Sequence, residues 1–509
     1  MSSRAFLLVL SMLAVISRTA SSLPATWYVD ASMPGSGDGV SWERAFKTIQ
    51  EGIDAATDGD VIIVAEGVYL EKVHFGGKNI VLRSTDPLDW NVVANTIIDG
   101  SQSDSVVTFA GTENETCVLS GFTIRNGLGE TGGGIRGGTL FGRSRPLIQC
   151  SVITGNSCWR GGGGLANCDG IIENNVITAN SAHWDGGGLN QCDGTIRNNR
   201  ITGNSADDEG GGLWKCNGII ENNLVSENWA GEGGGGLAWC GGTIRNNIIL
   251  GNRAGEGGDE RSLCGGGLAW CNGVIRSNAI FGNSAIGGGG GLALCHGDIA
   301  NNTVAANRSL AEAGGTYRCY AIITNCVIWG NSAPGGLQIS HPPAGPKEIG
   351  YCCIEGWTGD GEGNIALGPR FVDPDGSDDD PETWEDNDYR LLPDSPCIDA
   401  GLNQGWMLNA TDIVGNPRIC QGSRSLTVDI GAYEYFRSSI TKVRRTSEGE
   451  IELTWTSRPG DEYTVWSCWD LANGAWQKMG TTRAEEPWTS WMDASGEAKT
   501  RFFRIGWTE

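Results

Sequence analysis

The sequence has few of the residues from which metal centres, thiol redox sites and nucleic-acid interfaces are usually built. Its four His residues are scattered along 509 positions, which argues against a zinc site. It contains no Cys-x-x-Cys, no Gly-x-Ser-x-Gly elbow and no phosphate-binding loop. Lys and Arg number 36 against 60 Asp and Glu, and the net charge of −24 argues against nucleic acid and anionic membranes as partners.

Long apolar runs are also scarce. One run, Ala5 to Ile16, follows Arg4 and precedes small residues at 20–22, which is the pattern of a secretory signal peptide over residues 1–22. The run is too short to span a bilayer, and no other stretch is apolar enough. We therefore expect an exported protein, secreted or held at the cell surface, with no transmembrane segment in the mature chain. Export permits disulfides.

Glycine, by contrast, is in excess at 80 residues, and an internal repeat accounts for it. Asn recurs every 24 residues, except for one 31-residue step that carries a seven-residue insertion. Cys, Ile and Gly-Gly-Gly-Leu follow the same period, and a fixed period of this kind predicts a solenoid. The Asn column is Asn156, Asn180, Asn204, Asn228, Asn252, Asn283, Asn307 and Asn331. The Cys column is Cys168, Cys192, Cys216, Cys240, Cys271, Cys295 and Cys319.

The residues between these columns favour strands. Short Ile and Val runs are broken by Asn-Asn pairs and by Gly runs, which form helices poorly, and one Leu per repeat is too few for a leucine-rich repeat. We predict an all-β fold, a right-handed parallel β-helix with three brief strands per 24-residue coil. The Asn columns should form amide ladders. The charges of Glu173, Arg197, Glu221, Arg245 and Arg276 mostly alternate, which is expected of neighbours on stacked coils.

The aligned cysteines have parallel Cβ directions, which is poor geometry for disulfides, so we expect buried reduced thiols. Outside the column, Cys397 and Cys420 could close the loop 399–417 as a disulfide, and the sequence leaves their pairing open.

Five segments follow from these patterns. After residues 1–22 come an N-terminal strand and capping helix (23–60), the β-helix (61–350), an acidic loop with a capping, anchor-like module (351–436), and a fibronectin-like β-sandwich (437–509). The capping helix is predicted from Trp42 to about Ala56, with Ser41 as its N-cap and an apolar face covering the open end of the coil stack. Period-2 alternation predicts the sandwich strands.

Several motifs resemble a known family. They are Tyr28-Val-Asp-Ala-Ser32, the Gly-Gly-Gly-Leu-x-x-Cys-x-Gly repeats, Ser395-Pro-Cys-Ile-Asp-Ala-Gly401 and Asp429-Ile-Gly-Ala-Tyr-Glu434. Over residues 27–436 the chain resembles secreted bacterial right-handed β-helix proteins of the pectate-lyase-like superfamily. More narrowly, it resembles large surface proteins that end in a choice-of-anchor module. The resemblance implies architecture and export, whereas function has to be argued from a site.

Ionisable residues gather just after the Asn column, where the repeats vary. Stacking would place them on neighbouring coils about 5 to 10 Å apart, a range that brackets the carboxylate pairs of glycosidases. The candidate catalytic residues are Asp185, Asp207, Asp208, Glu209 and Glu232, with Glu256 in the same column. Calcium binding, glycan binding and plain solvated loop tips are the alternatives. A lyase of the resembled superfamily would also need a base, for which Arg160 and Arg261 are the candidates.

Aromatic residues flank this cluster and predict sugar stacking. The candidate substrate-binding residues are Trp159, Arg160, His183, Trp184, Trp214, Trp239 and Trp270. The last three lie beside the Cys column, where packing inside the core is the alternative.

An acidic stretch, 373–388, begins with Asp373-x-Asp375-Gly376 and continues to Asp378. This resembles the start of a calcium loop but departs from the EF-hand spacing. Calcium is therefore a candidate cofactor here, and a solvated acidic loop is the alternative.

We expect an exported surface or matrix protein that contacts polysaccharide without catalysis. The alternative is a polysaccharide lyase or glycoside hydrolase acting at the acidic cluster, and adhesion to protein is a third hypothesis. The sequence leaves the sugar, the means of anchoring and the oligomeric state open.

Overall fold

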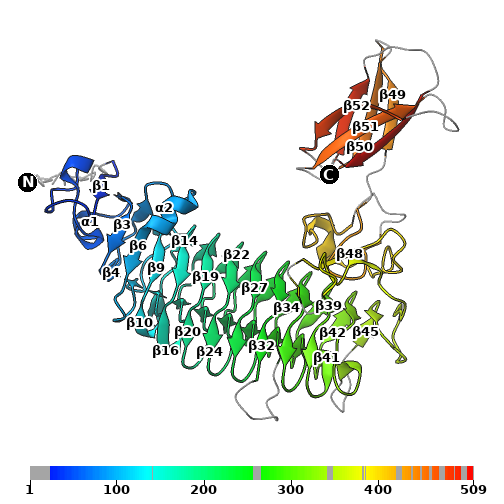
Figure 1. Ribbon diagram of the computed structural model, residues 1–509, viewed down its shortest axis with the longest axis horizontal. Coiled ribbons are helices and arrows are strands. Elements are labelled where there is room, and N and C mark those ends of the chain that lie inside the picture. The colour runs from blue at the N-terminus through cyan, green and yellow to red at the C-terminus, as the bar shows by residue number, and fades with distance from the viewer. Residues whose placement is uncertain are drawn as a thin grey trace, which may run out of the picture.

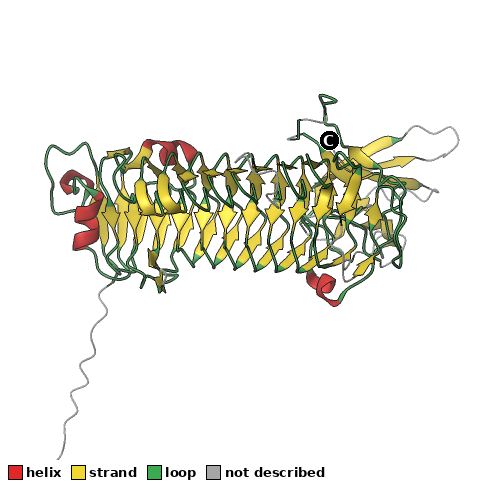
Figure 2. Ribbon diagram, turned by 90° about the horizontal axis from the view of Figure 1, so that it is seen from below, coloured by secondary structure: helices red, strands yellow, loops and turns green. Residues whose placement is uncertain are grey.

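The computed structural model has a nearly all-β fold built on four long parallel sheets of 13, 12, 11 and 8 strands (Figure 1). It confirms the predicted right-handed parallel β-helix, whose coils stack along the long axis of the molecule (Figure 2). The structure describes residues 23–139, 141–255, 265–340, 348–380, 383–384, 386–419, 427–436, 440–447, 450–457, 461–468, 476–485, 488–493 and 501–507.

Each regular coil contributes one strand to each sheet. In one coil these are β18 (Ile171–Glu173), β19 (Val176–Thr178), β20 (Ser181–Ala182) and β21 (Leu189–Asn190), in the 13-, 12-, 8- and 11-stranded sheets respectively. The prediction of three strands per coil is therefore wrong. The fourth strand, β20, has only two residues and lacks the apolar alternation that marks a strand in sequence, but it pairs with its copies in register.

The sheets differ in where they begin and end. The 13-stranded sheet runs from β1 (Thr26–Val29) to β45 (Glu348–Gly350), and the 12-stranded sheet from β3 (Gly67–Tyr69) to β46 (Cys353–Ile354). The 11-stranded sheet runs from β4 (Val73–His74) to β44 (Leu337–Ser340). The 8-stranded sheet contains β10 (Leu128–Thr131), β16 (Ser157–Gly161), β20, β24 (Ser205–Ala206), β28 (Trp229–Ala230), β32 (Arg253–Ala254), β36 (Ser284–Ala285) and β40 (Arg308–Ser309).

The interior is a continuous stack of buried apolar side chains. In a regular coil, Cys168, Ile172, Ile177 and Leu189 have no exposed surface. Burying each large aliphatic side chain stabilises the fold by roughly 1.5–3 kcal/mol. The column thiols are free and buried, and their Sγ atoms lie 3.4–3.6 Å from the carbonyl oxygen two residues earlier.

Two buried Asn ladders close the corners of the coils. Asn180 Nδ2 donates to the carbonyl of Ile153 at 2.8 Å and to Asn204 Oδ1 at 3.0 Å, and the backbone N–H of Asn180 donates to the same Oδ1 at 3.1 Å. This pattern repeats along the predicted column. A second ladder contains Asn175, Asn199, Asn223, Asn247, Asn278 and Asn302.

The predicted stacking of alternating charges is also present. Arg197 binds Glu173 at 2.6 Å and Arg245 binds Glu221 at 2.6 Å, each across one coil step of 24 residues. Because sequence spacing alone placed these pairs, they confirm the coil register.

The N-terminal cap is shorter in its helical part than predicted. A 3₁₀ turn η1 (Trp42–Arg44) is followed by extended backbone, in which Phe46 bridges Val29. The α-helix α1 (Ile49–Ala55) begins only after Thr48, whose side chain forms a capping box with Glu51. A helix over 42–56 capped by Ser41 is therefore wrong, because strand pairing at Phe46 competes with helix and Thr48 supplies the cap. Helix α1 buries Ile49 and Ile53 at the end of the stack (Figure 1).

A module after β46 folds back along the outside of the 12-stranded sheet (Figure 1). It contains β47 (Phe371–Asp373), β48 (Asp388–Leu391) and the 3₁₀ helix η2 (Gly405–Asn409). Tyr389, Phe371 and Trp384 pack on Phe281 and its neighbours in the sheet. A second helix, α2 (Trp90–Asn95), was not predicted and lies near the other end of this sheet.

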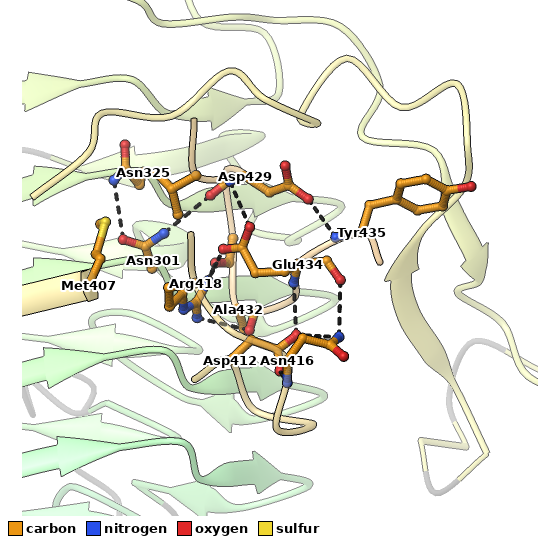
Figure 3. Close-up of polar contacts among 12 residues, drawn as sticks. Asn301, Asn325, Met407, Asp412, Asn416, Arg418, Asp429, Ala432, Glu434 and Tyr435 are labelled. Atoms are coloured by element: carbon orange, nitrogen blue, oxygen red, sulfur yellow. Dashed lines mark hydrogen bonds and ion pairs between the residues drawn. The ribbon is translucent and has the colours of Figure 1, made fainter. Parts of the chain in front are cut away.

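A buried polar cluster holds the module together (Figure 3). Arg418 is fully buried and donates to Glu434 Oε1 and to the carbonyls of Gly431 and Ala432, each at 2.9 Å. Asp412 accepts the backbone N–H groups of Asn416 at 2.7 Å and Glu434 at 2.9 Å. The Asp-Ile-Gly-Ala-Tyr-Glu motif therefore acts structurally, as one half of this cluster.

The same cluster attaches the module to the β-helix. Asp429 accepts backbone N–H groups from Asp399 and Tyr435, and its own carbonyl accepts from Asn301 Nδ2 at 3.2 Å. The N–H of Gly431 donates to the carbonyl of Asn325 at 2.8 Å. Asn301 and Asn325 belong to coils of the β-helix, so the docking is directional and polar as well as apolar.

Cys397 lies against Cys353 of β46 in the apolar contact between the module and the 12-stranded sheet. The predicted partner, Cys420, lies outside the described residues, so a Cys397–Cys420 disulfide stays a prediction.

The last segment forms a small β-sandwich of two antiparallel sheets. One contains β49 (Ile440–Arg445), β50 (Ile451–Thr456) and β53 (Trp488–Asp493), and the other β51 (Glu462–Cys468), β52 (Gln477–Arg483) and β54 (Phe502–Trp507). Leu453, Trp455, Tyr463 and Val465 form its core. Within the described residues of the chain, no helix is both long and apolar enough to cross a membrane.

Candidate functional site

The predicted carboxylates lie where the 8-stranded sheet turns towards the 11-stranded sheet. Backbone bonds show which residues stack: the N–H of Asp208 donates to the carbonyl of Trp184 at 3.0 Å, and the N–H of Glu232 to the carbonyl of Asp208 at 2.7 Å. Arg160 lies one coil before Trp184, because Gly161 bridges Asp185 and the N–H of Asp185 donates to the carbonyl of Arg160 at 3.0 Å. The structure therefore brings together residues from four coils. Glu256 and Arg261 lie outside the described residues.

Asp185 and Glu209 form the inner, partly buried pair of this cluster. They occupy neighbouring coils, because the N–H of Gly186 donates to the carbonyl of Glu209 at 2.9 Å. Burial, reinforced by repulsion from Glu209, raises the pKa of Asp185 to about 7. Burial also raises the pKa of Glu209, although hydrogen bonds from two indoles lower it. Asp185 is thus the carboxyl group that can hold a proton near neutral pH.

Two tryptophans hold the carboxylate of Glu209. Its Oε2 atom accepts from Trp214 Nε1 at 3.1 Å and from Trp239 Nε1 at 2.6 Å. Trp239 in turn stacks on Trp270, with ring centroids 5.3 Å apart and planes at 6°. The three indoles are absent from the buried interior of the described coils and lie on its outside.

Trp159 and Trp184 form an exposed edge beside the carboxylates. Their side chains are 63% and 48% exposed. Trp159 contacts the His183 ring edge-on at 5.1 Å, and the guanidinium of Arg160 lies 5.8 Å from the centre of the Trp184 ring. These contacts orient two indoles on neighbouring coils while leaving much of their surface open.

The outer carboxylates are differently engaged. Asp207 is exposed and binds His183 Nδ1 at 2.7 Å. Asp208 is half-buried and Glu232 is exposed. The five predicted carboxylates therefore comprise an inner pair with raised pKa, the half-buried Asp208 and two exposed carboxylates, a division that spacing alone does not reveal.

The predicted calcium ligands lie in the module. Asp373 is in β47 and pairs across to Asp388 of β48, while Asp378 accepts the hydroxyl of Thr383 at 2.8 Å. Asp375 lines a cavity beside Tyr389. Across the described ranges of the chain, no group of three or more His, Cys, Asp or Glu is arranged to hold a metal ion. Calcium binding at these residues stays a prediction.

One feature of the 8-stranded sheet was missed by sequence reasoning. A cavity of about 710 Å³ lies at the end of the sheet nearest the module, with Arg253, Ser284, Arg308 and Trp384 among the residues that line it. The available signal was the residue after each Asn of the column, which is Ser in the first three coils and varies afterwards, with Arg253 and Arg308 among the later residues. The contribution of Trp384, distant in sequence, could not be read from the period.

Comparison of the chain with protein-family models and with curated proteins gives no match, so the geometry of its own residues is what indicates a function.

Proposed function

We propose that this is an exported surface or matrix protein, of the pectate-lyase-like β-helix type, that binds a polysaccharide along its 8-stranded sheet without cleaving it. The observation that carries the proposal is the pair of exposed indoles, Trp159 and Trp184, on neighbouring coils. Large exposed aromatic groups in a cluster mark binding surfaces, and indole rings stack on the apolar faces of sugars. Their side-chain contacts with His183 and Arg160 support an ordered binding edge.

The engagement of the carboxylates supports binding over catalysis. Glu209 is held by two indole N–H groups, and Asp207 by His183. Such carboxylates can orient the indole and imidazole side chains that they bind, or accept hydrogen bonds from sugar hydroxyl groups.

Retention on insoluble glycans tests the proposal. The full-length protein should be retained on at least one member of a glycan panel, measured with and without calcium. The W159A/W184A double variant should bind about tenfold more weakly, because each aromatic contact contributes roughly 0.5–1.5 kcal/mol. The matched control is W90A in α2, since Trp90 is equally exposed at 49% but lies off this sheet. No retention of the wild type, or equal retention of W159A/W184A, would overturn the proposal.

A second candidate is hydrolysis or lyase cleavage, which one observation favours: Asp185 has a pKa of about 7 beside Glu209 on the next coil. Neighbouring coils are about 4.8 Å apart, close to the separation of a retaining glycosidase pair. Asp185 would be the general acid and Glu209 the nucleophile. Release of reducing ends, or of an unsaturated product, from soluble glycans would reveal activity. D185N should abolish it, whereas D208A should not.

Export is tested separately. Residues 1–22 lie outside the described part of the chain, and we propose that they are removed during secretion. The protein recovered from an expressing bacterium should be outside the cytoplasm and begin near Leu23. An intact Met1 on a cytoplasmic product would contradict this.

A further inference from the structure

We propose a second binding site, specific for an anionic sugar unit, in the cavity between the end of the 8-stranded sheet and the module that follows β46. We call this cavity the arginine groove. Arg253 and Arg308 would bind a carboxylate or sulfate group, and Trp384 would stack on the sugar ring. The inference rests on the proposed function in one respect, that the ligand is a polysaccharide, and it adds the charge of that ligand.

Strand register places the two arginines on one face. Arg253 of β32 pairs with Ser284 of β36, which pairs with Arg308 of β40. The arginines are therefore two coils apart, about 9.6 Å along the β-helix axis. Both side chains are exposed, and both line the cavity of about 710 Å³ together with Ser284 and Trp384. The groove is thus long enough to hold more than one sugar unit.

The charge of the groove contrasts with that of the molecule. Other arginines of the β-helix, such as Arg197 and Arg245, form ion pairs on neighbouring coils. Within the described residues, Arg253 and Arg308 have no ion-pair partner, and no Asp or Glu is among those that line the cavity. Although the chain carries a net charge of −24, charges farther away than about 10 Å are screened at physiological salt. Two unpaired guanidinium groups are suited to forked binding of an oxyanion.

Trp384 is held in place by an unusually close fit. Its ring lies over Gly251 and Gly282, and a Cβ atom at position 282 would come within 2.4–2.6 Å of three ring atoms. The ring is half-buried and belongs to the apolar cluster of Phe281 and Tyr389. An aromatic wall fixed in this way loses little freedom when a ligand stacks on it.

The 8-stranded sheet connects the groove to the coils that carry the exposed edge of Trp159 and Trp184. Trp229 precedes Arg253 in the outward column of the 8-stranded sheet, and Ser205 precedes Trp229. A single polysaccharide lying along this sheet would contact indoles at one end and guanidinium groups at the other.

The test compares three oligosaccharides of equal length and linkage: neutral, uronate-bearing and sulfate-bearing. Binding to full-length protein is measured by calorimetry in the presence of EDTA, which removes calcium bridging. The wild type should bind at least one anionic oligosaccharide more tightly than the neutral one. The R253Q/R308Q variant should lose about tenfold per arginine for that ligand, and little for the neutral one. The control is R200Q, because Arg200 is exposed on the 12-stranded sheet, away from the groove.

The outcomes separate the two proposals. If neutral and anionic oligosaccharides bind equally, or if R253Q/R308Q binds the anionic ones like the wild type, the anionic site is wrong. Sensitivity to W159A/W184A would in that case leave the proposed function standing. If no oligosaccharide binds the wild type, both proposals fail. The uronate and sulfate arms show which oxyanion the groove accepts.

Discussion

The Asn ladder makes a prediction that can be worked out bond by bond. In the middle of the first ladder, Asn228 Nδ2 donates to the carbonyl of Ile201 at 2.9 Å and to Asn252 Oδ1 at 3.0 Å. Its Oδ1 accepts from both the backbone N–H and Nδ2 of Asn204, each at 3.0 Å. Asn228→Ala removes all four bonds. Asn204 Nδ2 keeps its bond to Ile177, but the backbone N–H of Asn204 loses its buried acceptor.

The expected loss of stability in Asn228→Ala follows from these contacts. Four buried hydrogen bonds at about 1 kcal/mol each give a loss of about 4 kcal/mol, and a buried donor left unsatisfied adds to it. A loss of about 4 kcal/mol corresponds to roughly a thousandfold change in an opening equilibrium. Because solenoid coils interact with their neighbours, the loss should be concentrated in the coils around Asn228.

Urea unfolding and amide hydrogen exchange of the full-length protein measure the effect. We expect a lower unfolding midpoint for N228A and a large loss of protection at Asn204 and its neighbours. The matched control is N222G in the same repeat. Asn222 is exposed at φ +55°, a conformation that Gly adopts freely, and its side chain has no hydrogen-bond partner within the described part of the chain. If N228A unfolds within about 1 kcal/mol of N222G, the ladder does not carry the stability that we assign to it.

Three other perturbations test the module and the candidate site. Gly282→Ala should release the acidic stretch around Trp384, because the added Cβ would overlap the indole, and the release should appear as faster proteolysis of that stretch. Gly330→Ala is the matched control and should not have this effect, because Gly330 occupies the equivalent turn two coils further on, with φ +65° and open space around it. Arg418→Met leaves Asp412, Asp429 and Glu434 buried without a cation and should lower the free energy of unfolding by about 3–5 kcal/mol. Arg390→Met removes only the exposed Arg390–Asp388 pair and should lower it by less than about 1 kcal/mol. Urea unfolding measures both changes. Asp185 has a folded pKa of about 7, above its unfolded value, so its protonation stabilises the fold at low pH and this stabilisation is lost as pH rises through about 7. Asp185→Asn should flatten that part of the stability–pH curve relative to the wild type, and an unchanged curve would refute the raised pKa.

The 24-residue period predicted contacts correctly wherever equivalent positions of successive coils carry side chains that interact with one another. A 24-residue step fixes which side chains stack, so the Asn ladders and the Glu173–Arg197 pairing followed from spacing alone. The fourth strand escaped because two residues, Ser181–Ala182, show no alternation. The predicted start of α1 was wrong because Phe46 pairs with Val29, and no local sequence pattern indicates this contact.

The rest depends on contacts between distant residues of irregular sequence. The Asp429–Glu434 motif was visible, but its partner Arg418 is neither periodic nor adjacent, and the contact between them exists only in the folded module. Trp384 reaches Gly282 from about a hundred residues away, so the groove beside it had no signature within the repeats. The inner pair of the candidate site was located by spacing, whereas its burial had to be seen in the structure.

A straight β-helix also makes a prediction about ligand length. From the coil of Trp184 to that of Arg308 there are five coil steps, or about 24 Å along the axis. An oligosaccharide shorter than this can occupy the exposed edge or the arginine groove but not both, so its affinity should rise only slowly with length. Once the chain spans both, the second contact becomes intramolecular and the affinity should rise steeply. In R253Q/R308Q the steep rise in affinity should vanish, while short ligands should still bind the exposed edge of Trp159 and Trp184. A smooth dependence on length in the wild type would mean that the two sites do not share one ligand.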